Sequence, residues 1–452
     1  MSKPSITTPY LAVIVVLLLS SGMAYYHLGI FLPHFMQLHV AEGVGGGYSF
    51  GGDFYPIWLT SRQALLQHQN PYSPDMTRAI QIGLFRHPLS ARPPGDPLAN
   101  YRAFAYPAYV DLLFWPLALA PFPVVRVALA VSLTLLTVAS VSLWLRFLRF
   151  RASPSLLAIL LMLTLSSYSV LEGLAAVQLG LLVGFLLAAS FAALIGDRLF
   201  LAGTLIAFTF IKPQISALVA VYLVVWTISA WRKRRALVFG LFAWSALLGA
   251  ASLLVWPHWI GEWRRILSGY GGYSQPPLIT LSLGPDLGPK LGPFLTVALL
   301  AVAMILIWKM RNIPASSPWF ALTVSMLLAL TAITILPGQA VHDHVMLLPG
   351  IFLIALTWRS WFRTSRTLTV IVAAGALALF WQWMIGPFLV ILKCLLPAQF
   401  FTNSVIVLPF HAAASVPLAV SATLGYMMAK ALREGRFEGQ ILEPSTTSAG
   451  PS

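Results

Sequence analysis

An acidic residue, Asp53, follows a glycine pair in a long polar loop, and aromatic residues come directly after it. From Phe54 to Leu65, apolar side chains recur on one face at helical spacing. This pattern predicts an amphipathic helix that lies on a membrane surface. A carboxylate at its start could remove the proton from a hydroxyl group held against it. The alternative is an N-cap role, in which Asp53 accepts hydrogen bonds from the first helical N–H groups.

A second group of titratable side chains, His342-Asp343-His344, stands where a later apolar run begins. Titratable residues at the edge of a membrane span are functional candidates. A histidine here could donate a hydrogen bond to a phosphate or orient an acceptor. Ordinary interfacial histidines and a zinc site are the alternatives. Three residues in one turn, without a distant partner, do not make a zinc site, so we predict no metal and no cofactor.

A lysine, Lys212, stands in the sequence Ile211-Lys212-Pro213-Gln214, which interrupts two short apolar runs. A charged side chain at such a break is unfavourable in a membrane unless it faces water or an anion. Phosphate is the natural partner, because the ammonium group is a compact cation with several donors. The alternative is that Lys212 extends along the apolar surface to reach the interface.

Other polar residues are candidates for binding. Arginines of the outer loops could clamp a phosphate with two hydrogen bonds: Arg62, Arg78, Arg86, Arg92, Arg102, Arg126, Arg264 and Arg265. Glu172 and Gln178 lie in a turn between two apolar runs, where they could hold sugar hydroxyls or simply face solvent. In the predicted arrangement of the interfacial helices, Asp111 is the only other carboxylate that we expect to lie near Asp53. Phosphate-binding loops, a dinucleotide fingerprint and a Ser-His-Asp pattern are absent from the sequence.

The composition is that of a membrane protein. Of the 452 residues, 58% are hydrophobic and 9% are charged, whereas a soluble domain carries about 25% charged residues. The mean hydropathy is +0.82. The fold class predicted is therefore all-α, a polytopic bundle of transmembrane helices. The single cysteine, Cys394, excludes an intramolecular disulfide.

Breaks at proline, glycine and charged residues divide the chain into about twelve spans of roughly 17–25 residues. We place them near 11–31, 122–145, 154–171, 177–195, 199–211, 214–230, 236–256, 291–308, 317–336, 345–358, 367–388 and 404–429. One domain then covers 1–430. It includes a first outer loop at 32–121 with interfacial helices and a second outer loop at 257–290. The polar tail, 431–452, is predicted to be disordered in the cytosol.

Lysine and arginine are distributed as the positive-inside rule expects if both termini are cytosolic. Most of the 28 cations then fall in short inner loops, including the run Arg232-Lys233-Arg234-Arg235. The net charge of +15 therefore reflects topology and not nucleic-acid binding. The same alternation requires the stretch from Tyr106 to Pro121 to lie in the outer interface instead of spanning. This stretch is interrupted by Pro107 and Pro116 and carries Asp111. Asp53, Lys212 and His342 then share the outer face.

These residues, taken in order, resemble the motifs of glycosyltransferase family 87. The first-loop signature matches Asp53-Phe54-Tyr55, the amphipathic run and Asn70-Pro71-Tyr72, with His68 in place of a glycine. Later elements are similar to Tyr106-Pro107, Trp115-Pro116-Leu117, Gln178-Leu179-Gly180, Ile211-Lys212-Pro213 and the run from His342 to Pro349. The family's second proline after Tyr106 is replaced by Ala108, and its Ser and Trp before the late His-rich motif are absent.

The resemblance implies a GT-C type membrane enzyme. It would move a sugar, mannose or another hexose, from a polyprenyl-phosphate donor to a glycolipid, glycan or protein acceptor. Transfer would take place with inversion on the non-cytosolic face of a bacterial inner membrane.

By the same resemblance, Asp53 would be the general base, and His342 or His344 would support the acceptor or the phosphate. Lys212 and an outer arginine, Arg126 or Arg264, would hold the phosphate, and Tyr55, Tyr106 and Gln178 would contact substrate. Two alternatives stay open. A transporter or flippase of lipid-linked sugars would show inverted halves and broken helices near the midplane. A glycan polymerase or ligase would place its polar groups in a large late loop.

Overall fold

The computed structural model describes residues 7–41, 50–88, 102–270, 274–362 and 366–434. Within these ranges the chain forms helices and connecting loops, and the one β pairing is an isolated bridge between Pro277 and Pro337. The all-helical fold class is therefore confirmed. The predicted outer cation Arg92 lies outside the described residues.

Six helical segments are long and apolar enough to cross a membrane. They are Tyr10–Gln37, α6 (Phe122–Phe147), α12 (Trp231–Val255), α15 (Gly284–Met310), Ala373–Leu395 within α18 (Arg366–Leu395), and Leu408–Arg433 within α20 (Leu408–Glu434). A seventh results if α7 (Pro154–Leu165) and α8 (Tyr168–Ala176), bent by 55°, count as one span. The chain is thus a multi-pass membrane protein by length and composition.

Five shorter apolar helices occupy other predicted spans: α9 (Leu179–Ile195), α10 (Leu199–Thr209), α11 (Pro213–Ile228), α16 (Pro318–Thr334) and α17 (Leu348–Phe362). Each predicted span thus coincides with helix, but a total of twelve spans is not confirmed. These helices do not count as spans by themselves because they are too short. The 11 residues of α10 rise only about 16 Å at 1.5 Å per residue, against a hydrocarbon core of about 30 Å.

The first helix is longer than its predicted range. α1 (Thr7–Tyr26) continues through a π-helical turn, η1 (His27–Phe31), into α2 (Leu32–Ala41). The first loop was expected to begin at residue 32, but the residues that follow remain largely apolar and the helix persists. At the other end, α20 continues through the predicted domain boundary at 430 to Glu434. The remainder of the predicted tail, 435–452, lies outside the described residues.

Short helices form the first and second loops. They are α3 (Tyr55–Gln67), α4 (Pro74–Phe85), α5 (Tyr109–Phe114), the 3-10 turn η4 (Trp115–Leu119), α13 (Trp259–Tyr270) and α14 (Leu278–Leu281). The chain also has short turns at η6 (Ala398–Phe400) and α19 (Asn403–Ile406). The stretch around Pro116 therefore folds as two short pieces and is too short to span. His68, at the position of the family glycine, has a left-handed φ of 52° and ends α3.

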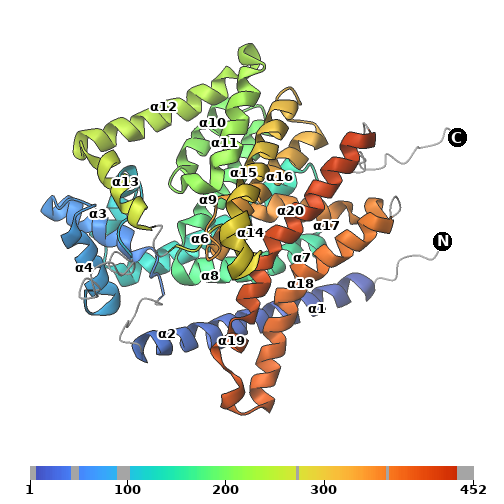
Figure 1. Ribbon diagram of the computed structural model, residues 1–452, viewed down its shortest axis with the longest axis horizontal. Coiled ribbons are helices and arrows are strands. Elements are labelled where there is room, and N and C mark those ends of the chain that lie inside the picture. Colours follow the sequence, from blue (N-terminus) through green and yellow to red (C-terminus); the bar gives the residue numbers. More distant parts are fainter. Residues whose placement is uncertain (1–6, 42–49, 89–101, 271–273, 363–365, 435–452) are drawn as a thin grey trace.

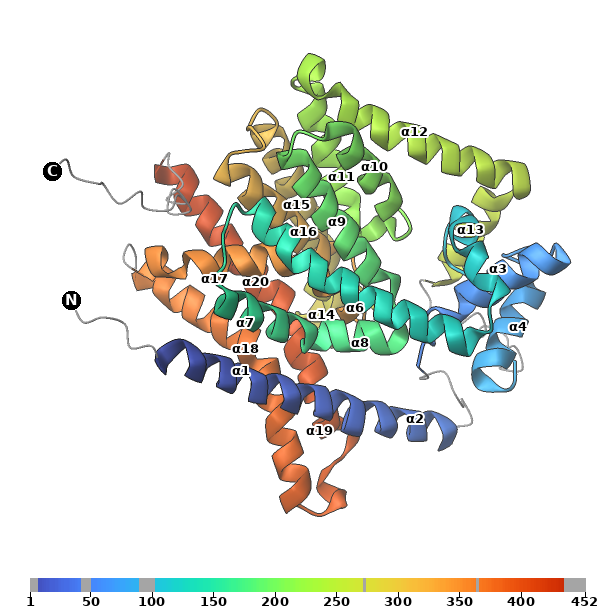
Figure 2. The ribbon, with the colours of Figure 1, turned by 180° about the vertical axis from the view of Figure 1, so that it is seen from behind.

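The loop helices gather at one side of the molecule. In Figures 1 and 2, α3, α4 and α13 lie together, whereas α1 begins and α20 ends on the opposite side. Side-chain hydrogen bonds hold this group together: the Trp58 indole donates to the Ala120 carbonyl at 3.0 Å, and the Trp263 indole donates to the Ala105 carbonyl at 3.0 Å. The second loop is thereby fixed against the first.

Close helix packing in the bundle depends on glycine where backbones meet. A Cβ on Gly203 of α10 would lie 1.9 Å from the Leu237 carbonyl oxygen of α12, and a Cβ on Gly240 would lie 2.2 Å from the Phe200 carbonyl oxygen. Small residues let membrane helices approach in this way, because apolar burial alone does not drive association in lipid.

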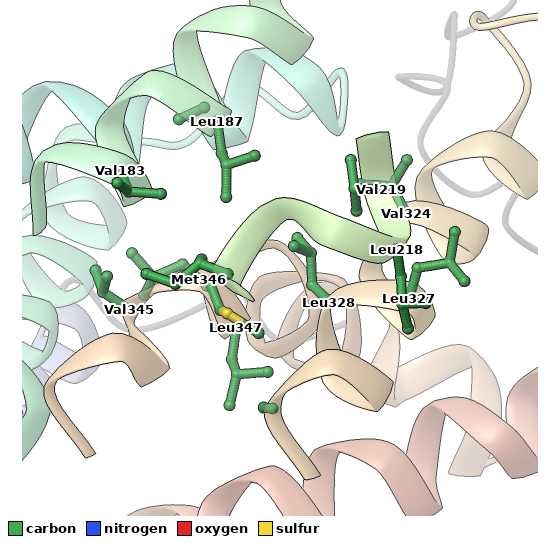
Figure 3. Packing of buried hydrophobic residues seen from close by; sticks show 14 of the residues in the cluster. Val183, Leu187, Leu218, Val219, Val324, Leu327, Leu328, Val345, Met346 and Leu347 are labelled. Carbon is green, nitrogen blue, oxygen red and sulfur yellow. The ribbon is translucent and has the colours of Figure 1, made fainter. Parts of the chain in front are cut away.

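The bundle centre holds a 3-10 turn, η5 (Val341–Leu347). Figure 3 shows its residues Val345, Met346 and Leu347 beside apolar side chains of α9, α11 and α16. These three side chains are buried. Burial of this apolar end fixes the preceding residues, His342 to His344, near the start of α9.

Candidate active site

The loop that carries Asp53 is fastened to the end of α8. The backbone N–H groups of Gly51 and Asp53 donate to the carbonyls of Ala175 and Ala176, at 2.8 and 3.2 Å. Gly51 has a φ of 84°, a left-handed conformation that glycine adopts without steric strain. The N-cap of α3 is Phe54, which makes no side-chain cap. The N-cap role considered for Asp53 is therefore not observed, and its carboxylate is directed elsewhere.

The Asp53 carboxylate has two side-chain partners. One oxygen accepts a hydrogen bond within an ion pair from Arg102, and the other accepts a hydrogen bond from the Gln178 amide at 2.6 Å. Both charged side chains keep some solvent contact, with 18% of the Asp53 side chain and 20% of the Arg102 side chain exposed. The carboxylate is therefore partly open to solvent while its two partners fix its orientation.

The surroundings of Asp53 favour the ionised form. Burial raises the pKa of the carboxyl, but the charges of Arg102 and His342 and the hydrogen bonds from Arg102 and Gln178 outweigh burial and hold it at about 2. In this arrangement Asp53 is an anion throughout the physiological pH range. It is also a weak base for as long as Arg102 stays paired with it.

Lys212 caps the break between α10 and α11 and is buried, with 6% exposure. Its ammonium donates to both oxygens of Asp343, at 2.6 and 2.8 Å, and to the Gln178 amide oxygen at 3.2 Å. Asp343 is 1% exposed. A continuous network thus runs from Arg102 through Asp53, Gln178 and Lys212 to Asp343.

The two histidines of η5 have different surroundings. The His342 imidazole lies 3.6 Å from an Asp343 oxygen and contributes to the electrostatics at Asp53. Burial lowers the pKa of the His342 imidazole, and in either protonation state the ring has at least one N–H to donate. His344 is buried and interacts with the backbone of Ala413 on α20. The structure therefore brings His342, and not His344, to Asp53.

Two predicted substrate contacts flank the Asp53 loop. Arg126 donates to the Phe50 carbonyl at 3.3 Å, and its guanidinium lies 5.4 Å from the Phe50 ring centroid. Tyr55 begins α3, with its ring centroid 5.0 Å from that of Phe122. Tyr55 and Phe122 line a cleft of about 400 Å³ together with Trp58, Arg62, Leu119, Pro121 and Pro123. An aromatic surface therefore begins two residues from Asp53.

The remaining predicted contacts lie further along the loops. The Tyr106 carbonyl accepts a hydrogen bond from the Tyr72 hydroxyl at 2.8 Å. Arg264 is exposed on α13, whose Glu262 accepts a hydrogen bond from Asn70 at 2.8 Å. Glu172, considered as a sugar contact, faces His27 of the first helix at 3.4 Å.

The second carboxylate of the first loop, Asp111, is enclosed between α3 and α5 with 3% exposure. One oxygen accepts a hydrogen bond from the Ser61 hydroxyl at 3.0 Å, and the other is buried without a hydrogen bond. Burial raises the pKa of Asp111 to about 7, although the Ser61 hydrogen bond acts in the opposite direction. This carboxyl is therefore less accessible from solvent than that of Asp53.

Sequence reasoning gave two members of the network no specific role. Arg102 was one of many outer arginines, and nothing in its neighbours marked it out. Asp343 was treated as part of a histidine cluster. A signal for Asp343 did exist, because a buried lysine needs a carboxylate partner and the chain has only 13 acidic residues. Among the described residues, no three His, Cys, Asp or Glu side chains are grouped to hold a metal ion.

The sequence model of glycosyltransferase family 87 matches residues 104–337, just over half of the chain. The chain belongs to glycosyltransferase family 87. Membership implies a membrane glycosyltransferase, in agreement with the helical bundle. No curated protein matches the chain, and no solved structure does so.

The family 87 match contains two members of the network, Gln178 and Lys212, and ends short of the others. Asp53 and Arg102 precede its first residue, and His342 and Asp343 follow its last. The fold brings both flanks to the matched segment, through the hydrogen bonds that Gln178 donates to Asp53 and that Lys212 donates to Asp343.

Proposed function

We propose that this protein transfers a hexose from a polyprenyl-phosphate donor to a hydroxyl of a lipid, glycan or protein acceptor. The transfer takes place with inversion, on the non-cytosolic face of a bacterial inner membrane. The observation that supports this proposal most directly is the pairing of a partly exposed carboxylate, Asp53, with an arginine, Arg102, on a loop at the edge of an apolar bundle. Family 87 membership supplies the reaction class.

In the proposed reaction the acceptor oxygen attacks the anomeric carbon of the donor sugar. The bond between that carbon and the phosphate oxygen breaks, and the polyprenyl phosphate leaves with the electron pair. Asp53 takes the proton of the acceptor hydroxyl as the new glycosidic bond forms. No metal or redox partner is needed for atoms and charges to balance, provided cations stabilise the phosphate as its charge increases.

Arg102 is the cation that we assign to the donor phosphate. A guanidinium binds phosphate through two parallel hydrogen bonds, and the Arg102 side chain retains 20% exposure. When phosphate draws Arg102 away, Asp53 loses the partner that weakens it as a base. The base then becomes effective when the donor is present. Asp53 stays oriented by Gln178 and close to His342.

Lys212 contributes to the same site indirectly. Its ammonium is engaged by Asp343 in the free protein, so it acts on the phosphate through its position behind Gln178 and not by direct contact. Tyr55, Tyr106, Arg126 and Arg264 remain predicted substrate contacts. Among them, Tyr55 and Arg126 lie closest to the Asp53 loop.

The direct test is turnover by purified protein in lipid nanodiscs with polyprenyl-phosphate hexoses and a bacterial lipid extract as acceptor. We expect a hexose-containing product and free polyprenyl phosphate in equal amounts, both lost in Asp53→Asn. Retained turnover in Asp53→Asn would remove this residue from the base role. Donor crossing a vesicle bilayer without product would point to a transporter instead.

The orientation of the protein in the membrane can be tested separately. Lys233 lies near the start of α12, Ser268 lies near the end of α13, and both are exposed. Each is replaced singly by cysteine in a Cys394→Ser background. We expect an impermeant thiol reagent to label Ser268→Cys in intact spheroplasts and to label Lys233→Cys only after the membrane is opened. The reverse pattern would place the Asp53 loop in the cytosol and contradict the proposed sidedness.

A further inference from the structure

The buried end of the site network contains an ion pair that the proposed chemistry does not use directly. Lys212 lies at the start of α11 and Asp343 lies in η5, 131 positions apart in the chain. Both oxygens of Asp343 accept from the one ammonium, which also donates to Gln178. The three N–H groups of Lys212 therefore have three acceptors, and the ammonium is fixed in place.

This fixed ammonium decides which end of the Gln178 side chain faces Asp53. An ammonium can only donate hydrogen bonds, so the Gln178 carbonyl oxygen must face Lys212. The amide nitrogen is then directed to Asp53, to which it donates at 2.6 Å. If the Gln178 amide were reversed, its NH2 group would face the Lys212 ammonium, and both groups are donors. Its carbonyl oxygen would face the Asp53 carboxylate, and both groups are acceptors.

The space for the Asp343 carboxylate exists because residue 180 is glycine. A Cβ on Gly180 would lie 2.0 Å from an Asp343 oxygen, so the carboxylate occupies the volume that a side chain would take. Gly180 belongs to the first turn of α9, two residues after Gln178. The same helix start therefore presents Gln178 to Asp53 and accommodates the counter-ion of Lys212.

We infer that Asp343 is a positioning residue for the transfer reaction: it holds Lys212 against Gln178 and away from Asp53, so that the base keeps a neutral hydrogen-bond donor instead of a second cation. The inference rests on the proposed function, because it assigns Asp343 a role through Asp53. Without Asp343, the ammonium has no carboxylate partner, and Gln178 alone separates it from Asp53, which already faces Arg102 and His342.

The first experiment changes the Asp343 position without changing any polar group. Gly180→Ala is expected to lower kcat about tenfold or more, because small displacements around a catalytic group reduce rates strongly, while the KM for donor stays within about twofold. Gly184→Ala is the matched control, since its Cβ would meet only Val345 of η5, at 2.8 Å, on the same helix. Equal kcat values for the two variants would overturn the inference.

The second experiment separates positioning from stability. Asp343→Asn is expected to lower kcat about 10–100-fold, within the range that general-base catalysis contributes. The acidic limb of the kcat–pH profile should move to lower pH, because the freed ammonium stabilises ionised Asp53. The double variant Lys212→Met with Asp343→Asn removes both buried charges and should recover thermal stability but not kcat, because Gln178 then lacks the ammonium that orients its amide toward Asp53. Recovery of kcat together with stability would show a purely structural pair.

These outcomes distinguish the inference from the proposed function on which it rests. If Asp53→Asn is inactive while Gly180→Ala and Asp343→Asn keep the wild-type kcat and pH profile, Asp53 remains the base and Asp343 loses its role. If Asp53→Asn retains turnover, the base assignment itself is wrong.

Discussion

Two carboxylates of the outer region, Asp53 and Asp111, have opposite surroundings. Asp53 faces Arg102, Gln178 and His342, and its pKa is held at about 2. Asp111 lies between α3 and α5 with one hydrogen bond, from Ser61, and burial raises its pKa to about 7. The basicity of Asp111 suits proton abstraction better, but its position does not. In the proposed mechanism, access to a substrate and the ability to change partners therefore decide which carboxylate acts as the base.

The strongest test of this contrast applies the same substitution to both residues. Asp53→Asn should reduce kcat at least about 100-fold, since a general base contributes that much or more. Asp111→Asn should leave kcat within about threefold, because Asn keeps the acceptor that Ser61 uses and resembles a protonated carboxyl. Steady-state turnover in nanodiscs measures both. A larger loss in Asp111→Asn, with the protein still folded, would exchange the two roles.

A smaller effect is expected when the partner of Asp53 is changed. Arg102→Gln should raise the KM for donor about 10–100-fold, because a charge-assisted hydrogen bond contributes about 1.5–3 kcal/mol. The KM for acceptor should change little. The acidic limb of the kcat/KM profile should move to higher pH, because the pKa of Asp53 in the free enzyme rises once the cation is removed. Arg78→Gln, at an exposed ion pair with Asp75, is the control. An unchanged donor KM would assign the phosphate to another cation.

The smallest effect concerns stability at Asp111. The folded-state pKa of Asp111 lies above that of the unfolded chain, so the folded protein binds more protons between about pH 4 and 7. Its contribution to stability is therefore lost as the pH rises through this window. Asp111→Asn should flatten the dependence of melting temperature on pH between 5 and 8. A slope identical to that of the wild type would show that Asp111 is ionised in the fold.

The outline of this fold could be predicted from sequence because lipid constrains it. Apolar runs broken at Pro154, Pro213 and Pro318 mark helix starts in the structure, since proline fits the first helical turn. The number of crossings could not be predicted in the same way. Short apolar helices such as α16 are enclosed by other helices, and an apolar sequence is the same whether it faces lipid or protein.

The candidate site was only partly visible in the sequence. Asp53, Gln178, Lys212 and His342 were each selected from their own local patterns, and the structure brings them together. Arg102 and Asp343 received no role, since nothing local distinguishes a cation that pairs with a carboxylate from one that faces water. His342 and His344 could not be separated either, because which of two nearby rings faces Asp53 depends on how η5 packs against α8, α9 and α20.

The amino-acid sequence alone determined that the chain is a helical membrane protein, where its helices lie, and which family it resembles. Hydrophobicity and proline act over a few residues and can therefore be read along the chain. Tertiary structure decided which charges meet. The pairs Asp53–Arg102 and Lys212–Asp343 join residues far apart in the chain, and only the packing of α8, α9, α11 and η5 brings those side chains within hydrogen-bonding distance.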